Sequence, residues 1–248
     1  MTLPLALLHG FTGSPVSFAP VLDALGPVDA FLPRLVGHGD PADAAVGSFD
    51  AEVDRLAELL SARASRWALA GYSLGGRLAL GLLVRHEALF GRAVLIGAQP
   101  GLAAAADRRD RATADEAWCQ LLETEGISAF ADAWQRQPLF ATQADLPGPR
   151  LEAQRRERIG HDPRGLARSL RVTGLSVMPD LMPQLRGVQA PTTWMAGERD
   201  VKFRGVAERM AAALPGARAE IVPGAGHNLP LERPGEVARV LRAELERA

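Results

Sequence analysis

The chain has 248 residues, of which 47% are hydrophobic and 23% are charged, and this composition is typical of a single globular domain with a sizeable core. Its formal net charge of -1 argues against nucleic acid or an anionic membrane surface as a partner, because either would favour an excess of basic residues. The single cysteine, Cys119, excludes an internal disulfide and a cysteine-based metal cluster, and no hydrophobic run is long enough to span a membrane.

Short hydrophobic runs alternate with helical patterns along most of the chain. The first run lacks the basic and long hydrophobic regions of a signal peptide, so we interpret it as a strand and expect a soluble, cytoplasmic protein. The predicted strands cover residues 3–8, 30–32, 67–70, 93–96, 192–195 and 220–222. Helical spacing appears at residues 49–64, 74–85, 206–214 and 234–245. This alternation predicts an α/β fold with a mostly parallel sheet that is flanked by helices.

The alternation is interrupted between residues 101 and 185, where no strand pattern appears. This stretch is rich in alanine and charged residues, and residues 107–123 and 151–158 have helical spacing. We therefore predict a core formed by residues 1–100 and 186–248, with a helical lid over residues 101–185 inserted between two strands. Because acidic residues balance the arginines of this segment, most of these arginines are expected to be solvated or paired across helix turns.

A Gly-Tyr-Ser-Leu-Gly sequence at residues 71–75 follows one predicted strand and opens the next predicted helix. In that context a Gly-x-Ser-x-Gly pattern forms a strained turn that presents the serine at the carboxyl edge of the sheet. The glycines allow the chain to reverse tightly and leave space around the hydroxyl. We therefore predict that Ser73 is catalytic; a tight turn with a bystander serine is the alternative.

A serine hydroxyl is a poor nucleophile or base near neutral pH and needs an imidazole partner oriented by a carboxylate. The sequence supplies both, because Asp200 and His227 each follow the end of a later predicted strand. The carboxyl ends of strands are where open α/β sheets place their sites. Glu198 is the alternative acid, but it lies closer to the strand end. The sequence therefore predicts a catalytic set of Ser73, Asp200 and His227.

A glycine-containing turn at residues 9–13 follows the first predicted strand. Such a turn can direct backbone N–H groups toward an oxygen on which negative charge develops. We predict that the amides of Phe11 and Leu74 form this oxyanion hole, with His9 as a packed, non-catalytic residue. An ordinary strand-to-helix turn is the alternative.

Several further segments narrow the interpretation. They are residues 71–77, 100–102, 137–140, 178–181, 197–203 and 225–228, together with Trp118 and Trp134. The nucleophile motif and the order of its partners resemble the α/β-hydrolase fold, which hosts esterases, lipases, lyases and receptors. The whole set, which spans nearly the entire chain, is similar to the 2-succinyl-6-hydroxy-2,4-cyclohexadiene-1-carboxylate synthase family of menaquinone biosynthesis.

This resemblance implies a lyase that needs no cofactor and no metal. Its reaction converts 2-succinyl-5-enolpyruvyl-6-hydroxy-3-cyclohexene-1-carboxylate to 2-succinyl-6-hydroxy-2,4-cyclohexadiene-1-carboxylate and pyruvate. Ser73, polarised by His227 and Asp200, would take the ring proton next to the succinyl ketone, and the oxyanion hole would hold the enolate. A carboxylesterase or carbon–carbon bond hydrolase with the same three side chains is the alternative, and a non-enzymatic receptor is a third interpretation.

A small-molecule substrate with three carboxylates requires several cations, and the arginine fork suits this task. The resemblance assigns anion binding to Arg77, Arg111, Arg158 and Lys202, the only lysine of the chain. It assigns the aromatic lining to Phe11, Tyr72, Trp134 and Phe140. The alternatives are solvated lid arginines, a tyrosine that packs beneath the turn, and tryptophans that pack inside the lid.

Overall fold

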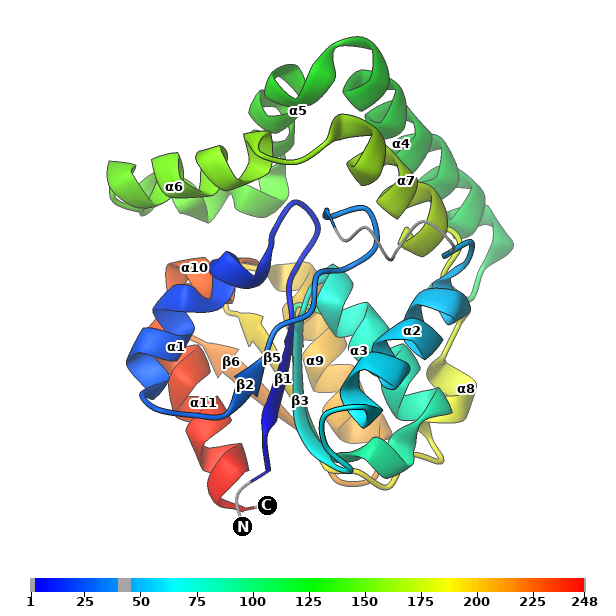
Figure 1. The fold of residues 1–248 in the computed structure, drawn as a ribbon, viewed down its shortest axis with the longest axis vertical. Coiled ribbons are helices and arrows are strands. Elements are labelled where there is room, and N and C mark those ends of the chain that lie inside the picture. Colours follow the sequence, from blue (N-terminus) through cyan, green and yellow to red (C-terminus); the bar gives the residue numbers. More distant parts are fainter. Residues whose placement is uncertain (1–2, 40–45, 248) are drawn as a thin grey trace.

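The computed structural model describes residues 3–39 and 46–247, and Figure 1 shows a sheet flanked by helices with a further group of helices above it. The strands are β1 (Leu5–Leu8), β2 (Ala30–Phe31), β3 (Trp67–Tyr72), β4 (Phe90–Ile96), β5 (Thr192–Gly197) and β6 (Ala217–Val222). They form one sheet in the order β2-β1-β3-β4-β5-β6, and each neighbouring pair is parallel. All six predicted strands are therefore confirmed.

Helices cover both faces of this sheet. One face carries α2 (Phe49–Ser61), α3 (Leu74–Arg85), α8 (Met182–Leu185) and α9 (Val201–Ala213), and the other carries α1 (Ala19–Leu25), α10 (Leu229–Glu232) and α11 (Pro234–Glu246). In β1, Leu5 and Leu7 pack against the second group, whereas Ala6 and Leu8 pack against the first. Because successive side chains of a strand point to opposite faces, a strand covered on both sides is hydrophobic throughout.

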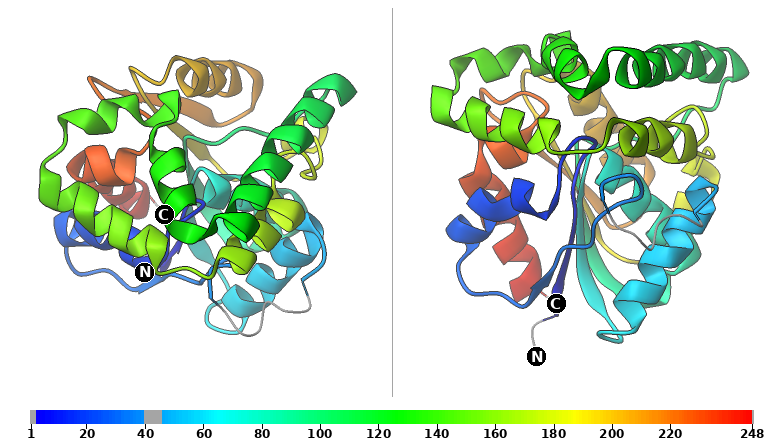
Figure 2. Two further views of the ribbon diagram at one scale, coloured as in Figure 1. Left: turned by 90° about the horizontal axis from the view of Figure 1, so that it is seen from above. Right: turned by 45° about the horizontal axis from the view of Figure 1, so that its top comes forward.

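Between β4 and β5 the chain forms a helical insertion of α4 (Ala105–Thr124), α5 (Gly126–Gln135), α6 (Gly148–Ile159) and α7 (Pro163–Thr173). Figures 1 and 2 show it across the carboxyl-terminal edge of the sheet. The insertion has its own small hydrophobic core, in which Cys119, Phe130 and Leu166 are fully buried. This core explains why a segment rich in charged residues nevertheless folds as a unit over the sheet.

Some helices differ from the predicted pattern. The helix expected at residue 206 begins at Val201, because the Asp200 side chain accepts a hydrogen bond from the Phe203 N–H and caps the first turn. That turn exposes Val201 and Lys202, so it carries no hydrophobic repeat. Helix α7 begins behind a similar cap, since Asp162 accepts from the N–H groups of two residues in its first turn.

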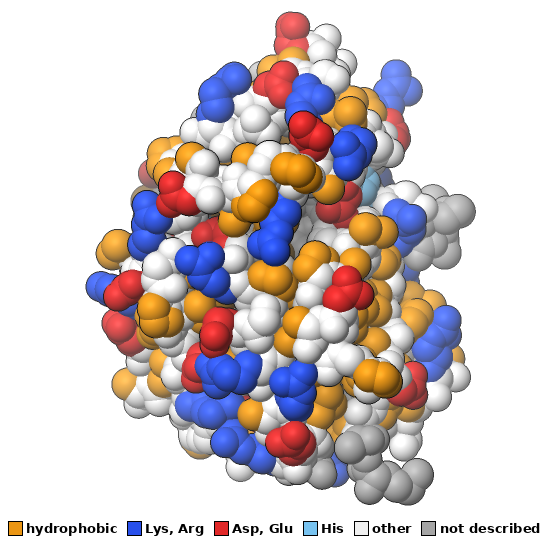
Figure 3. Space-filling view, turned by 90° about the vertical axis from the view of Figure 1, so that its left-hand side faces the viewer, with side chains coloured by type: hydrophobic (Ala, Val, Ile, Leu, Met, Phe, Trp, Pro, Cys, Tyr) orange, Lys and Arg blue, Asp and Glu red, His pale blue; other side chains and the backbone are white. Residues whose placement is uncertain are grey.

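Within residues 3–39 and 46–247, no helix is long and apolar enough to cross a bilayer. The same residues contain no group of three His, Cys, Asp or Glu side chains placed to hold a metal ion. Figure 3 looks onto the side that carries α1, α6, α10 and α11, where basic and acidic side chains are interspersed over most of the surface. This face therefore offers no broad field of one sign.

Candidate active site

Ser73 lies in a sharp turn between β3 and α3. Its backbone has φ +52° and ψ -106°, a conformation that is costly for a residue with a side chain, by about 1–3 kcal/mol. A Cβ atom on Gly71 would lie 2.4 Å from the carbonyl oxygen of Gly75, and one on Gly75 would lie 2.1 Å from that of Leu8. Only glycine fits at both positions. The close backbone approach in this strained turn therefore accounts for both glycines of the Gly-x-Ser-x-Gly pattern.

The structure brings Ser73, His227 and Asp200 together. The Nδ1 atom of His227 lies 2.7 Å from Oδ2 of Asp200, and its Nε2 atom lies 3.2 Å from Oγ of Ser73. Because a carboxylate only accepts, Nδ1–H donates to Asp200 and Nε2 is free to accept the serine proton. The alternative acid, Glu198, is exposed and accepts a hydrogen bond from the Gly224 N–H instead.

The Phe11 and Leu74 amides lie in the two turns that follow β1 and β3. The register pairs Leu8 with Gly71, so these turns are neighbours at the carboxyl edge of the sheet. Leu74 is the first residue of α3, where backbone N–H groups have no intrahelical acceptor. Within the described part of the chain, neither amide donates a hydrogen bond to another protein group. Both N–H groups are thus available to a substrate oxygen, and their role remains a prediction.

Two buried histidines support the turn that carries Phe11. His9 accepts a hydrogen bond from the Leu35 N–H, and His38 accepts one from the Thr12 N–H. A protonated imidazole cannot accept, so both rings must stay neutral in the folded chain. Burial accordingly lowers the pKa of His9 to about 3, and burial together with the neighbouring histidines holds the pKa of His38 well below its usual value. His9 is therefore a structural residue, as the sequence predicted.

Acidification is expected to destabilise the fold through these histidines. Between the unfolded pKa of about 6.5 and the folded pKa of His9 near 3, the unfolded chain binds more protons, so the free energy of unfolding falls as the pH falls. Each such histidine contributes about 1.4 kcal/mol per pH unit. Urea unfolding of the wild type and His9→Gln between about pH 7.5 and about pH 5 measures this difference in slope. Equal slopes would contradict the assignment. The control is His86→Gln, at a partly exposed histidine that pairs with Asp54.

A cavity of about 270 Å³ contains both Ser73 and His227 and is lined by three cations, Arg77, Arg111 and Lys202. Phe11 and Trp134 supply aromatic walls; the other lining residues are Gly97, Gln99, Gln137, Leu139, Leu170, Leu175 and Phe203. The predicted anion-binding side chains thus meet beside the serine, with one exception described below.

Protein acceptors hold the two arginines of this cavity in place. Arg77 donates through Nη1 to the carbonyl oxygen of Thr173, at 2.8 Å, and Arg111 donates through Nε to Asp115, also at 2.8 Å. Burial, reinforced by the charge of Arg111, lowers the pKa of Arg77 to about 10. Arg77 therefore remains cationic at neutral pH. Partial desolvation of the Lys202 ammonium, again reinforced by the charge of Arg111, lowers the pKa of Lys202, although much of its side chain is exposed. The crowding of three basic side chains in one cavity favours an anionic occupant.

The fourth predicted cation, Arg158, lies in an adjacent cavity of about 250 Å³ with Tyr72 and Phe140. Arg158 is only 3% exposed, and its Nε and Nη1 atoms have no hydrogen-bond partner within the described residues. Its guanidinium carbon lies 5.4 Å from the centre of the Phe140 ring, and burial lowers its pKa to about 10. Phe11 lines both cavities, so its side chain separates the two cationic regions.

Tyr72 precedes the serine and faces the second cavity. Its ring centre lies 5.4 Å from that of His227, and its side chain also packs against Gly10. Burial raises the pKa of the Tyr72 hydroxyl well above its usual value, so the group stays neutral. Tyr72 therefore both packs beneath the turn and lines a cavity, which combines the two interpretations left open by the sequence.

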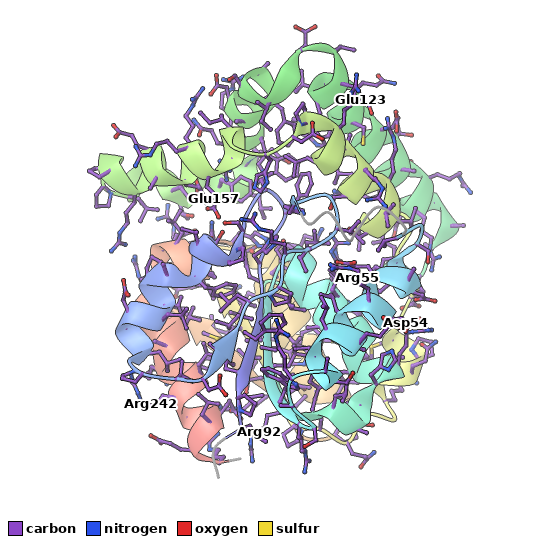
Figure 4. The ribbon with its side chains drawn as sticks, viewed as in Figure 1. Asp54, Arg55, Arg92, Glu123, Glu157 and Arg242 are labelled. Atoms are coloured by element: carbon purple, nitrogen blue, oxygen red, sulfur yellow. The ribbon has the colours of Figure 1, made fainter. Side chains whose placement is uncertain are left out.

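Helix α6 is attached to the turn beyond Phe11. Figure 4 shows Glu157 extending from α6 toward that turn, where one of its oxygens accepts from the hydroxyls of Ser14, at 2.6 Å, and Ser17, at 2.7 Å. This contact fixes the part of the insertion that carries Arg158. Neither Glu157 nor Asp115 was predicted from the sequence, although the spacing from Arg111 to Asp115 is that of a helical ion pair.

Comparison with known proteins places this geometry in a family. Residues 5–240 match the Alpha/beta hydrolase family. A 2-succinyl-6-hydroxy-2,4-cyclohexadiene-1-carboxylate synthase from Escherichia coli O17:K52:H18 is 35% identical over 96% of this chain and 93% of its own length. One from Enterobacter sp. strain 638 is 34% identical over 96% of this chain and 89% of its own.

Solved structures give the same result. The structure of MenH from S. aureus superposes with a TM-score of 0.94 and 28% identity, covering 99% of this chain and 94% of that one. An esterase from Thermogutta terrifontis, at 22% identity and a TM-score of 0.83 over 99% of this chain and 90% of its own, shares the fold alone. The chain therefore belongs to the alpha/beta hydrolase family and is related over almost its full length to the 2-succinyl-6-hydroxy-2,4-cyclohexadiene-1-carboxylate synthases.

Proposed function

We propose that this protein is a carbon–oxygen lyase that releases pyruvate from 2-succinyl-5-enolpyruvyl-6-hydroxy-3-cyclohexene-1-carboxylate, a step of menaquinone biosynthesis. The observation that carries the proposal is the cavity that holds Ser73 and His227 together with Arg77, Arg111 and Lys202. An ester with one carboxylate or none would leave cations of this cavity unpaired, whereas a tricarboxylate can pair with all three. The proposal is also supported by the names of the related synthases, which are named for the cyclohexadiene product of this reaction.

The reaction begins with proton transfer at the serine. His227 accepts the proton of the Ser73 hydroxyl, and Oγ takes the ring proton next to the succinyl ketone. The electron pair left on the ring carbon moves onto the ketone oxygen, where the amides of Phe11 and Leu74 stabilise the negative charge. Asp200 keeps the imidazole in the required tautomer and stabilises its cationic form.

Elimination completes the step. The enolate electrons return to form a double bond between C2 and C3 of the ring, the existing C3=C4 double bond shifts to C4=C5, and the bond between C5 and the enolpyruvyl oxygen breaks. The leaving enolpyruvate takes up the proton held by His227 and becomes pyruvate, while the proton on Ser73 restores the starting state. No water is consumed and no acyl group becomes attached to the serine.

The cations bind the carboxylates and hold the ring over Ser73. Carboxylates on one side of Phe11 bind to Arg77, Arg111 and Lys202. A carboxylate on the other side binds to Arg158, and the hydrocarbon part of the substrate there packs against Tyr72 and Phe140. Arginine forks remain charged when water is excluded, which suits them to this role. Orientation of the ring lowers the barrier because the reacting proton is delivered directly to Oγ.

Product analysis tests the proposal. Purified protein with the enolpyruvyl substrate is expected to release pyruvate, measured with lactate dehydrogenase, together with an equal amount of conjugated diene, measured by its ultraviolet absorbance. Turnover of short-chain aryl esters is expected to be slow. Fast ester hydrolysis without pyruvate release would instead identify the protein as a carboxylesterase with the same three side chains.

A further inference from the structure

A second buried carboxylate lies beside the turn that carries His227. Glu232, the last residue of α10, is 4% exposed. Its Oε2 atom accepts a hydrogen bond from the Gly226 N–H at 2.7 Å, and its Oε1 atom accepts one from the Asn228 N–H at 3.1 Å. These donors are the residues immediately before and after His227. No ion pair joins Glu232 to a cation in the described part of the chain.

We infer that Glu232 is a positioning residue for His227, holding the backbone on both sides of the histidine so that Nε2 faces Ser73. The inference rests on the proposed role of His227 as the proton acceptor. The ring of His227 is held at Nδ1 by Asp200 and packs against Tyr72 and Phe203. These contacts act on the ring and do not restrict rotation of the two peptides that flank the histidine. Two amides bound to one carboxylate remove this rotation and fix the Cα–Cβ direction of the histidine.

Only a carboxylate meets this requirement. The two amides converge on two separate oxygens, and each bond to a charged acceptor is about twice as strong as a neutral one. A glutamine would offer one oxygen and turn its NH₂ group against the other N–H.

The short helix α10 connects Glu232 rigidly to the turn. Asn228 caps this helix, because its Oδ1 atom accepts from the Leu231 N–H at 3.3 Å, and the Glu232 N–H donates to the carbonyl oxygen of Asn228 at 2.8 Å. The carboxylate, the turn and the helix thus form one closed set of hydrogen bonds around His227. Burial raises the pKa of Tyr72, and the negative charge of Glu232 raises it further. The electrostatic field of Glu232 therefore reaches the residue that precedes Ser73.

The test is the variant Glu232→Gln, with Glu198→Gln as the matched control. Glu198 also accepts from an amide of this turn, that of Gly224, but it is exposed and lies farther from His227 along the chain. Glu232→Gln is expected to lower kcat for pyruvate release about ten- to hundredfold with KM changed less than about twofold, because misplacement affects the proton acceptor and leaves the cations in place. Glu198→Gln is expected to match the wild type.

A second readout does not depend on the lyase reaction. An alkyl fluorophosphonate inactivates a serine whose proton can be taken by the histidine: Oγ attacks phosphorus, fluoride leaves and the proton passes to Nε2. The inactivation rate of Glu232→Gln is expected to fall by the same factor as kcat. If the glutamine variant unfolds, Glu232→Asp is the second variant, because it keeps the charge but withdraws the oxygens by one methylene. Thermal unfolding checks that both variants are folded.

The outcomes separate the two proposals. A folded Glu232 variant with wild-type kcat and a wild-type inactivation rate would overturn the positioning role, and so would a rise in KM with kcat unchanged. If the wild type releases no pyruvate but reacts with the fluorophosphonate, the proposed function fails, and the inactivation rates of the variants still decide the role of Glu232.

Discussion

Replacement of Ser73 with alanine is expected to lower kcat for pyruvate release by about a thousandfold, since general acid–base transfer contributes about 10²–10⁴-fold. His227→Ala is expected to have a comparable effect, because in the proposed mechanism one proton passes between Nε2 and Oγ, which lie 3.2 Å apart. Residues that act as a unit are not additive, so the double variant is expected to be little worse than either single variant. The measurement is steady-state pyruvate release at saturating substrate.

The matched controls are a serine and a histidine away from the turn. Ser61 is exposed at the end of α2, and His86 pairs with Asp54 at the end of α3. Ser61→Ala and His86→Ala are therefore expected to retain wild-type kcat. Wild-type turnover in both Ser73→Ala and His227→Ala would remove these residues from the mechanism.

Substitution of Arg158 with methionine is expected to lower kcat/KM by tens-fold or more while raising the free energy of unfolding. Loss of one partner of a buried charge-assisted contact costs about 2–5 kcal/mol. In the absence of substrate, however, two nitrogen atoms of Arg158 are buried without a hydrogen-bond partner in the described structure. A hydrophobic side chain of similar length avoids that desolvation, which stabilises the fold by about 1–3 kcal/mol.

Arg156→Met is the control for this experiment. Arg156 lies on the same helix and is exposed, and among residues 3–39 and 46–247 it pairs only with Glu152, at 3.8 Å. It is expected to change neither kcat/KM nor the urea midpoint beyond about 0.5 kcal/mol. If Arg158→Met loses stability and retains kcat/KM, Arg158 is a structural residue of the insertion.

The positions of the strands along the chain and the place of the three central residues could be predicted from the sequence. The strands are hydrophobic on both faces, and Ser73, Asp200 and His227 each follow a strand directly, so one sheet edge must bring their turns together. The contacts among these three side chains depend on local turns at the strand ends, and glycine patterns in the sequence indicate those turns. The resemblance to a family then supplied the lid arginines, which no local pattern distinguishes.

The direction of each lid arginine depends on tertiary contacts. Arg155 pairs with Asp132 from α5, Arg156 faces solvent, and Arg158 enters a cavity, although all three lie within one turn of α6. A rotation of about 100° per residue decides which of them is buried, and the docking angle of α6 is set by Glu157. The sequence spacing alone is compatible with any of these arrangements.

Contacts made by a carboxylate to backbone amides are equally hidden in the sequence. Glu232 lies in an unremarkable Leu-Glu-Arg-Pro segment, and its partners become evident only when α10 folds back on the turn. Asp115 and Glu157 likewise act on groups that the fold brings to them. Side chains that hold other site residues in place have no recognisable sequence motif, whereas strained turns do.

The most direct test of the account is a deuterium isotope effect on pyruvate release. The substrate carries deuterium at the ring carbon next to the succinyl ketone, and kcat/KM is compared with that of the unlabelled substrate. Removal of this proton at Ser73 predicts slower release from the deuterated compound. Equal rates for the two compounds would contradict proton abstraction at that carbon as the step that the serine performs.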